Sequence, residues 1–128
     1  MKKKLLIIED DQMLIRMYRI KLEQEGFETA VVDNGFEGLK KLEQNEYDLI
    51  ILDLMMPTMD GFKMLEEYNK SNKYNKAPII VLSNLGQKED LELAFALGIK
   101  EDQYIVKANM TPSEVVEKIQ TTLKEDHA

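Results

Sequence analysis

The sequence lacks cysteine and tryptophan and contains only one histidine, three prolines and six glycines in 128 residues. Without cysteine the chain has no disulfide, no thiolate nucleophile and no cysteine-ligated zinc or iron–sulfur centre, which fits a reducing compartment. Apolar runs such as Leu49–Leu52 are far shorter than the roughly 20 residues that cross a bilayer, and Glu9 comes too early for a signal peptide. These absences predict a soluble, cytoplasmic protein.

Positive charge is also scarce, because 17 basic side chains stand against 24 acidic ones and the formal net charge is −7. The basic run at the start of the chain is only Lys2–Lys4. Affinity for nucleic acid comes mainly from lysine and arginine that neutralise phosphates, so we expect no direct binding to nucleic acid. The composition favours cations or basic protein surfaces as partners and predicts no contact with a membrane.

The length suits one domain, at roughly 150 residues per domain, with a core over about residues 4–124. Five short apolar runs stand too far apart for hairpins. They are Leu5–Ile8, Ala30–Val32, Leu49–Leu52, Ile79–Leu82 and Tyr104–Val106. Continuous rather than alternating hydrophobicity is typical of strands covered on both faces, so the runs predict a parallel sheet between helices.

The segments between these runs carry apolar residues at helical spacing. The predicted helix faces are Met13, Leu14, Met17 and Ile20; Phe36, Leu39 and Leu42; Phe62 and Leu65; and Val115, Val116, Ile119 and Leu123. Asp60-Gly61 is expected to open the third helix, and Thr111–Glu114 has the cap, proline and acid that start the last one. In the fourth helix Leu91, Ala94, Phe95 and Gly98 form an inward face, which leaves Leu93 and Leu97 as additional core or as a partner-binding patch; we favour the patch.

The predicted order is therefore strand and helix five times over. Right-handed crossovers make this an α/β fold with a doubly wound parallel sheet, and such sheets bind ligands beyond the carboxyl ends of their strands. Chemically active side chains stand at those ends. They are Glu9, Asp10 and Asp11 after the first run, Asp53 after the third, Ser83 after the fourth and Lys107 after the fifth.

Clustered carboxylates need compensation, since two of them at about 4 Å repel by roughly 4 kcal/mol at an effective dielectric constant of 20. Proton uptake, a lysine or a divalent cation can supply it. One lysine does not balance Glu9, Asp10 and Asp53, and a set of oxygen ligands without histidine or cysteine favours Mg²⁺. A carboxylate beside such a cation can act as a nucleophile that forms an aspartyl-phosphate, with a lysine and a hydroxyl on the phosphoryl oxygens.

Four motifs in this order and spacing resemble the receiver domains of two-component response regulators, over Lys4 to Leu123. The motifs are Ile7–Asp11, Asp48–Pro57 with Met59–Gly61, Pro78–Ser83 and Tyr104–Lys107. The resemblance implies a flavodoxin-like (βα)5 fold with strand order 2-1-3-4-5. It also implies a signalling phosphoacceptor that catalyses only its own phosphorylation and dephosphorylation, on Asp53, with a histidine kinase or a histidine phosphotransfer protein as donor.

The resemblance further implies a role for each site residue. Asp10 would be the principal Mg²⁺ ligand, with Asp53, the main-chain carbonyl of Met55, and Glu9 through metal-bound water. Ser83 and Lys107 would contact phosphoryl oxygens. Tyr104 would be an aromatic switch that turns inward as Ser83 moves, altering the face formed by the fourth helix, fifth strand and fifth helix.

The resemblance extends to domain organisation and partners. Residues 1–128 would be a single receiver domain without an output domain, signalling to a downstream protein, with a phosphorylation-dependent dimer as an alternative to a monomer. Met55 and Leu85 fall where the family tunes the access of hydrolytic water, and both are apolar here, so we hypothesise a slowly hydrolysing phosphoprotein.

Three features depart from the family pattern. Ala108 replaces the usual proline after Lys107, which favours a trans peptide bond there, and Asn84 replaces a small residue beside Ser83. The segment between Gly98 and Tyr104 is about two residues longer than usual in this family, by the resemblance.

Other interpretations stay open. Asp11 suits a helix cap as well as a site role, and Tyr104 suits core packing nearly as well as a switch. His127, in the charged tail, is expected to be inert. The main alternative function is a phosphorylation-independent adaptor, followed by a phosphatase of the aspartyl-phosphate type. A flavin carrier or a nucleoside triphosphatase is disfavoured, because the acids after the first strand repel phosphate and no glycine-rich phosphate loop is present.

Overall fold

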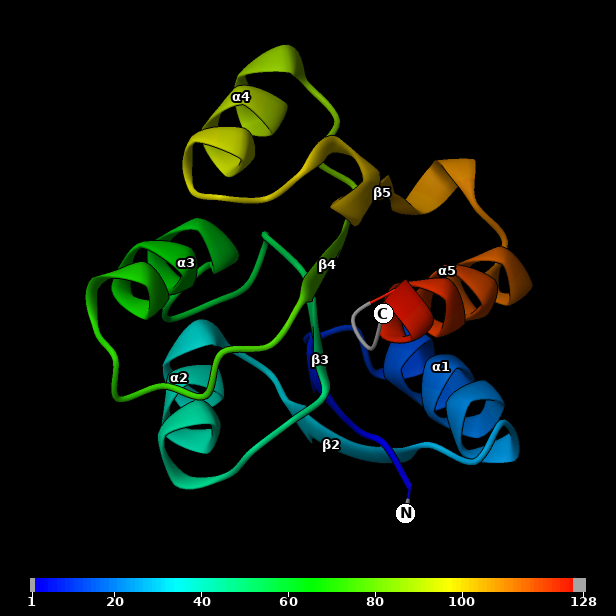
Figure 1. The fold of residues 1–128 in the computed structure, drawn as a ribbon. Helices are drawn as coiled ribbons and strands as arrows, with labels where there is room; N and C mark the ends of the chain where they lie inside the picture. Colours follow the sequence, from blue (N-terminus) through cyan, green and yellow to red (C-terminus); the bar gives the residue numbers. More distant parts are fainter. Residues whose placement is uncertain (1, 126–128) are drawn as a thin grey trace.

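The computed structural model describes residues 2–125 and contains one five-stranded sheet (Figure 1). The strands are β1 (Lys4–Ile8), β2 (Glu28–Val32), β3 (Leu49–Leu52), β4 (Ile79–Ser83) and β5 (Tyr104–Val106). Their order is β2-β1-β3-β4-β5, and every neighbouring pair is parallel. The predicted doubly wound α/β fold and its strand order are therefore confirmed, and each predicted strand is present to within two residues.

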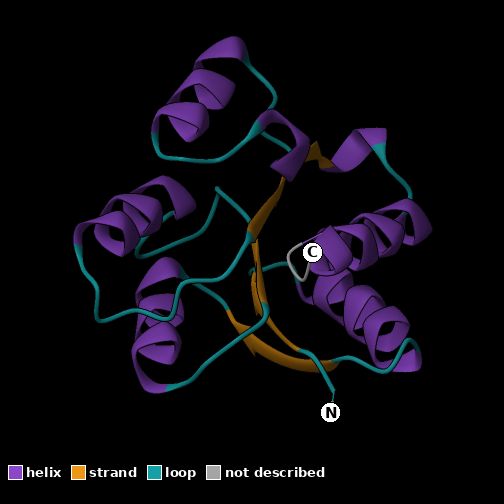
Figure 2. Ribbon diagram, in the orientation of Figure 1, coloured by secondary structure: helices purple, strands orange, loops and turns teal. Residues whose placement is uncertain are grey.

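Helices cover both faces of the sheet, as Figure 2 shows. They are α1 (Gln12–Gln24), α2 (Gly35–Gln44), α3 (Gly61–Lys70), α4 (Lys88–Ala96) and α5 (Pro112–Glu125), with short 3₁₀ turns η1 (Glu101–Gln103) and η2 (Lys107–Asn109). α1 and α5 lie on one face, and α2, α3 and α4 lie on the other (Figure 1). The turn η1 takes up the longer segment before β5. His127 lies outside the described residues.

The strands supply the centre of two apolar layers, because successive side chains of a strand point to opposite faces. On β1, Leu6 and Ile8 pack toward α2 and α3, whereas Leu5 and Ile7 pack toward α1 and α5. All four of these side chains are buried. A sheet buried on both faces leaves its strand ends as the place where polar side chains can gather.

The predicted face of the first helix is partly wrong, because Leu14 and Met17 pack against the core but Met13 and Ile20 are exposed. The buried residues of α1 are Ile15, Tyr18 and Leu22, while Met13 is 84% exposed. The predicted row and the buried row of side chains both have helical spacing, so spacing alone does not show which row faces the sheet. Tyr18 completes the buried row because its ring is apolar even though its hydroxyl is polar.

The predicted inward face of the fourth helix is also partly wrong. Ala94 is the one fully buried residue of α4, and Phe95, predicted to point inward, is 39% exposed. Leu93 is 46% exposed, as the patch interpretation expects, but Leu97 packs against the core. A similar error affects Phe36 at the start of α2, which is exposed.

The predicted helix starts are confirmed. Asp60 caps α3 by accepting a hydrogen bond from the N–H of Lys63 at 2.9 Å. Thr111 and Glu114 form a reciprocal pair at the start of α5, each side chain accepting from the other residue's N–H, at 3.2 and 2.9 Å. Within residues 2–125, no helix has the length and apolar character needed to cross a membrane.

Candidate phosphoacceptor and metal site

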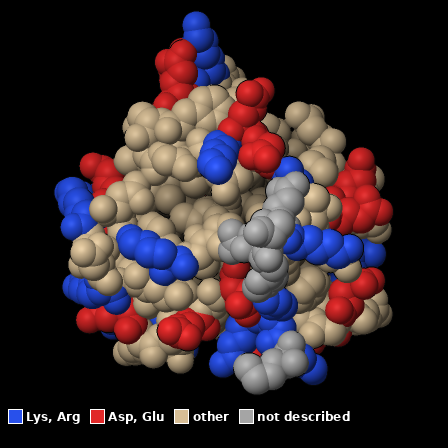
Figure 3. All heavy atoms as spheres, viewed as in Figure 1, with Lys and Arg blue, Asp and Glu red and all other residues tan. Residues whose placement is uncertain are grey.

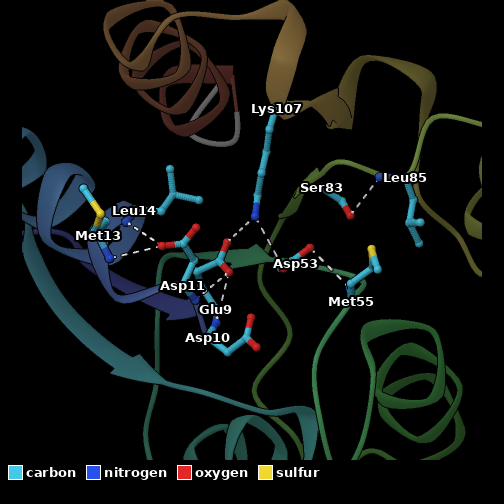
Figure 4. Close-up of polar contacts among 10 residues, drawn as sticks. All are labelled: Glu9, Asp10, Asp11, Met13, Leu14, Asp53, Met55, Ser83, Leu85 and Lys107. Atoms are coloured by element: carbon cyan, nitrogen blue, oxygen red, sulfur yellow. Dashed lines mark hydrogen bonds and ion pairs between the residues drawn. The ribbon is translucent and has the colours of Figure 1, made fainter.

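Adjacent strands bring the acidic residues together at one edge of the sheet. Ile8 and Leu52 are register partners on β1 and β3, so Glu9 and Asp53, which follow them, emerge side by side. The N–H of Asp53 donates to the carbonyl of Ile8 at 3.0 Å, which extends the ladder to the edge. Figure 4 shows both carboxylates with Lys107, from the end of β5, pointing between them.

Three carboxylates form a compact cluster at this edge. Glu9, Asp10 and Asp53 each offer an oxygen, and these atoms lie within 4.8 Å of one another. Glu9 and Asp53 are only 4% and 5% exposed, whereas Asp10 is exposed. Two buried acids and one at the surface make a site that is mostly desolvated yet open on one side. The predicted convergence of these residues is confirmed.

Lys107 contacts both buried acids. Its ammonium nitrogen lies 2.8 Å from Glu9 Oε1 and 3.4 Å from Asp53 Oδ2. Burial acts to lower the pKa of Lys107, but the hydrogen bond that Lys107 donates to Glu9 and the charge of Asp53 outweigh it and raise the pKa, so the side chain stays charged. No peptide bond in residues 2–125 is cis, so Lys107 reaches the acids with Ala108 in a trans linkage.

Glu9 is the acid most affected by its surroundings. Its Oε2 accepts hydrogen bonds from the N–H groups of Asp10 and Asp11, at 3.0 and 3.1 Å. Burial nevertheless raises the pKa of Glu9 from 4.5 to about 7, since desolvation exceeds the opposing effect of Lys107 and Asp53 adds repulsion. One lysine therefore leaves the cluster incompletely neutralised, as expected for carboxylates that a cation would bind.

Asp11 belongs to the helix rather than to the cluster. Its Oδ1 accepts from the N–H groups of Met13 and Leu14 at 3.1 and 3.2 Å, so it caps α1. Of the two interpretations that the sequence allowed for Asp11, the helix cap is the one present. The cap also fixes the turn that positions Glu9 and Asp10 at the edge.

The residues fit Mg²⁺ by the chemistry of their donors, because all three side chains offer hard carboxylate oxygens and no histidine or cysteine is near in the sequence. The loop after β3 contacts the site through its main chain. The N–H of Met55 donates to Asp53 Oδ1 at 3.3 Å. A Cβ on Gly61 would lie 2.6 Å from the carbonyl oxygen of Asp53, so only glycine lets α3 start this close to the site.

Ser83 and Tyr104 are joined through the main chain of Leu85. Ser83 is fully buried at the end of β4, and its Oγ accepts from the N–H of Leu85 at 3.3 Å (Figure 4). The hydroxyl of Tyr104 donates to the carbonyl of Leu85. Burial, with repulsion from Asp90 and Asp53, raises the pKa of Tyr104 to about 12, so it remains a donor. Asn84 is exposed.

The sequence analysis identified Ser83 and Tyr104 but not the peptide groups that connect them. Main-chain hydrogen bonds of a loop leave no residue-type signature, so nothing in the sequence could have revealed the role of Leu85. Tyr104 packs partly against the core and also contacts this loop through its hydroxyl. The main chain of Leu85 therefore contacts both Ser83, at the end of β4, and Tyr104, on β5.

Comparisons with known proteins agree with this geometry. A family model described as the response regulator receiver domain matches residues 5–120. The chain is 34% identical to the transcriptional regulatory protein SrrA of Staphylococcus aureus over 124 residues, which are 97% of this chain and 49% of that protein. The chain thus spans about half the length of the curated relatives it matches.

Solved structures resemble the chain over nearly its whole length. A CheY-like response regulator receiver domain protein from Methanospirillum hungatei has a TM-score of 0.86 at 29% identity, covering 99% of this chain and 98% of that one. The phosphorylated cyanobacterial phytochrome response regulator RcpA has a TM-score of 0.80 at 26% identity, covering 94% and 91%.

Proposed function

Because this chain belongs to the response regulator receiver domain family of two-component systems, we propose that Asp53 accepts a phosphoryl group from a histidine kinase or a histidine phosphotransfer protein. The observation that carries the proposal is the position of Asp53, a buried carboxylate at an open strand edge, 3.4 Å from Lys107 and clustered with Glu9 and Asp10. One solved relative, RcpA, is described as phosphorylated, which supports the same chemistry here.

In the proposed reaction an oxygen of Asp53 attacks the phosphorus of a phosphohistidine. The oxygen–phosphorus bond forms, the nitrogen–phosphorus bond breaks, and the departing imidazole nitrogen keeps the electron pair and takes a proton. Lys107, already directed at Asp53, neutralises the charge on one phosphoryl oxygen. The hydroxyl of Ser83 can donate its hydrogen to another, while its oxygen accepts from Leu85.

We propose Asp10, Asp53 and the main-chain carbonyl of Met55 as the ligands that hold Mg²⁺, with Glu9 acting through a bound water. When bound, the cation supplies positive charge between the carboxylates and the phosphoryl oxygens. The raised pKa of Glu9 supports this assignment, because it indicates a carboxylate that still lacks sufficient positive charge. In this role the domain is a phosphoacceptor that promotes only its own phosphorylation and dephosphorylation.

The proposed output is a conformational change of the α4, β5 and α5 face, read by a protein partner. A phosphoryl oxygen that binds Ser83 draws the loop of Leu85 toward the site, and Tyr104 follows because its hydroxyl donates to Leu85. The phosphoryl group would contact Ser83 in one state only, which is the differential interaction that such a change requires.

The test is to incubate the purified protein with acetyl phosphate and Mg²⁺ and to weigh it intact. We expect an adduct of about 80 Da that alkali removes, as for an acyl phosphate. Asp53→Asn should abolish the adduct, and Asp10→Asn should slow its formation. Glu66→Gln, which removes an exposed carboxylate on α3, is the matched control and should behave as wild type.

An adduct that persists in Asp53→Asn would place the phosphoryl group elsewhere. If neither acetyl phosphate nor a mixture of phosphorylated histidine kinases gives an adduct, the phosphorylation-independent adaptor becomes the better assignment. The two results are distinct, because the first leaves a phosphoprotein and the second does not.

A further inference from the structure

The connection between β2 and α2, residues 32–35, contacts both chain segments that carry the proposed metal ligands. At its start, the carbonyl oxygen of Val32 accepts a hydrogen bond from the N–H of Glu9 at 3.0 Å. At its end, the N–H of Gly35 donates to the carbonyl oxygen of Met59 at 2.8 Å. Glu9 belongs to the first ligand segment, and Met59 belongs to the loop after β3, which carries the second. The connection therefore bridges the two segments through main-chain atoms.

Gly35 lets α2 begin in direct contact with the loop after β3. A Cβ at this position would lie 2.9 Å from the carbonyl oxygen of Met59 and 3.1 Å from that of Asp60. It would also lie 2.9 Å from the Cβ of Met64, on α3. Main-chain oxygen atoms and a Cβ cannot move away by rotation of a side chain, so any residue larger than glycine would have to displace the loop or the helix.

The loop after β3 makes a strained turn beside this contact. Thr58 has a φ of 67°, the only positive φ at a residue other than glycine within residues 2–125. The N–H of Met59 closes the turn by donating to the carbonyl oxygen of Pro57 at 2.7 Å. A β-branched residue adopts a positive φ at a cost in free energy, and it keeps this conformation only where the surrounding structure holds it. The hydrogen bond from Gly35 to the next residue is one of the contacts that hold it.

The same loop carries the main-chain carbonyl of Met55, one of the proposed Mg²⁺ ligands. The loop is fixed at its start, because the N–H of Met55 donates to Asp53 Oδ1 at 3.3 Å. Between Met55 and the strained turn, the side chain of Met56 packs against the core, and Pro57 has a restricted φ. The short segment from the Met55 carbonyl to the Gly35 contact therefore has little freedom to absorb a displacement.

We infer that Gly35 is a positioning residue for the Mg²⁺ site, because it fixes the loop that presents the carbonyl of Met55. Val32 has the corresponding role for the segment of Glu9, through its own carbonyl oxygen. The β2–α2 connection thus sets the separation of the two ligand segments, although it supplies no ligand itself. The inference deepens the proposed function and rests on it for the identity of the cation and of the Met55 ligand.

The experiment measures the dissociation constant of Mg²⁺ by isothermal titration calorimetry, on the full unphosphorylated chain after removal of metal with EDTA. Gly35→Ala should raise the dissociation constant about tenfold, because groups that hold a metal ligand in place typically contribute this much or more. Gly38→Ala is the matched control on the same helix, since its Cβ would meet Ile8 Cδ1, the far end of a side chain, at 2.7 Å. It should change the dissociation constant less than twofold. Alanine favours a helix more than glycine does, so neither variant weakens α2 through propensity.

Two helix-cap variants test the same link without adding a side chain to the contact. Asn34 caps α2, because its Oδ1 accepts from the N–H of Glu37 at 2.9 Å. Asn34→Ala should loosen the turn that carries Gly35 and raise the dissociation constant of Mg²⁺ about threefold. Thr111→Ala removes the side-chain acceptor for the N–H of Glu114 at the start of α5, and it should change the dissociation constant less than twofold. Circular dichroism checks that each variant is folded.

Salt separates binding at the cluster from weak attraction of Mg²⁺ to surface acids. Figure 3 shows acidic and basic side chains interspersed over the face of the molecule that it draws. Attraction to exposed charges of this kind is largely screened at an ionic strength of about 0.15 M, whereas a mostly buried cluster is screened much less. The titrations are therefore made at that ionic strength, and Glu66→Gln should bind Mg²⁺ as the wild type does.

Equal dissociation constants for the Gly35 and Gly38 variants would overturn the inference. If Gly35→Ala does not fold, the Asn34 and Thr111 variants decide in the same way. Intact mass after treatment with acetyl phosphate is read on the same proteins. A wild type that binds Mg²⁺ and forms the adduct, with unchanged Mg²⁺ affinity in Gly35→Ala, refutes only the positioning role. A wild type without saturable Mg²⁺ binding refutes the proposed metal site, and the positioning role with it.

Discussion

At the scale of single residues, Glu9 combines two roles that conflict. Its carboxylate must be ionised to take part in a cation site, yet burial raises its pKa to about 7. Without a cation, part of the Glu9 population therefore holds a proton near neutral pH. The sequence predicted the crowding of acids after β1 and β3, but not which acid would take up the proton, because burial is set by the packing of the whole edge.

Stability without Mg²⁺ should consequently depend on pH. Glu9 has a pKa of 4.5 when unfolded and about 7 when folded, so between these values the folded state binds more protons. The free energy of unfolding should fall as pH rises from about 5 to about 7, by at most about 3 kcal/mol, and then level off. Urea denaturation in EDTA, repeated across this pH range, measures the change in the free energy of unfolding.

Glu9→Gln cannot titrate and should remove most of that slope. Glu66→Gln, with the same chemical change on the surface of α3, should retain it. If the slope is unchanged in Glu9→Gln, another group is responsible and the raised pKa of Glu9 is wrong. Addition of Mg²⁺ should oppose the slope, because the cation favours the ionised carboxylate that forms at higher pH.

Met55 and Leu85 should make the phosphoryl group long-lived. The N–H of Met55 donates to Asp53, and that of Leu85 donates to Ser83, so both side chains start beside the site (Figure 4). The Met55 side chain is 55% exposed and carries no group that orients water strongly. We expect decay of the phosphoprotein with Mg²⁺ over minutes or longer, followed by intact mass.

Met55→Asn places an amide where it can hold a water near phosphorus, and it should shorten the half-life several-fold. Met13→Asn, another exposed methionine at the start of α1, should leave the half-life unchanged. A wild-type half-life of seconds would contradict the hypothesis, as would equal effects of the two substitutions.

At the scale of elements, α4 is held mainly at its two ends. Tyr104 contacts the loop before it, through Leu85, and Asn69 of α3 donates from its side-chain amide to the carbonyl of Leu97, at 2.7 Å. Between these contacts only Ala94 is fully buried. A helix anchored in this way can shift at one end without loss of a large apolar core.

Asn69→Ala should release the C-terminal end of α4. The loss of one hydrogen bond should cost about 1 kcal/mol. Hydrogen exchange should increase in α4 and leave α1 and α5 unchanged. Asn72→Ala, beyond the end of α3, is the control and should not change exchange in α4. Equal exchange in the Asn69 variant would mean that packing rather than this contact holds the helix.

Elements differ in how well the sequence predicts them. The strands were predictable because both of their faces are buried, which gives continuous apolar runs such as Leu49–Leu52. The helix faces were less predictable, because α1 carries two rows of apolar side chains at helical spacing. Only packing against the sheet determines that Tyr18, rather than Met13, is covered. The last helix has a single apolar row, and its face, including Val115 and Ile119, was predicted correctly.

At the scale of the whole molecule, the acidic side chains divide into a clustered region and a dispersed remainder with different consequences. Three acids form the first region, the strand-edge cluster, and the other acids are spread along the rest of the chain. The sequence predicted the first region because its acids follow apolar runs directly.

Mg²⁺ should stabilise the entire fold through the first region. A ligand that binds only the folded state at a hundred times its dissociation constant adds about 2.7 kcal/mol to the free energy of unfolding. The strand edge exists only when β1 and β3 are paired, so the unfolded chain offers no comparable site. Thermal denaturation should show a melting temperature that rises with Mg²⁺ and returns to its starting value with EDTA.

Two variants and a salt control separate Mg²⁺ binding at the cluster from general screening of the acidic surface as the cause of the higher melting temperature. Asp10→Asn should lose most of the rise, whereas Glu66→Gln should keep it, and sodium chloride at matched ionic strength should reproduce little of it. Asp10 is exposed, so its substitution leaves the core intact and the variant should still fold. An equal rise in both variants would mean that Mg²⁺ acts on the surface charge rather than at the cluster of Glu9, Asp10 and Asp53.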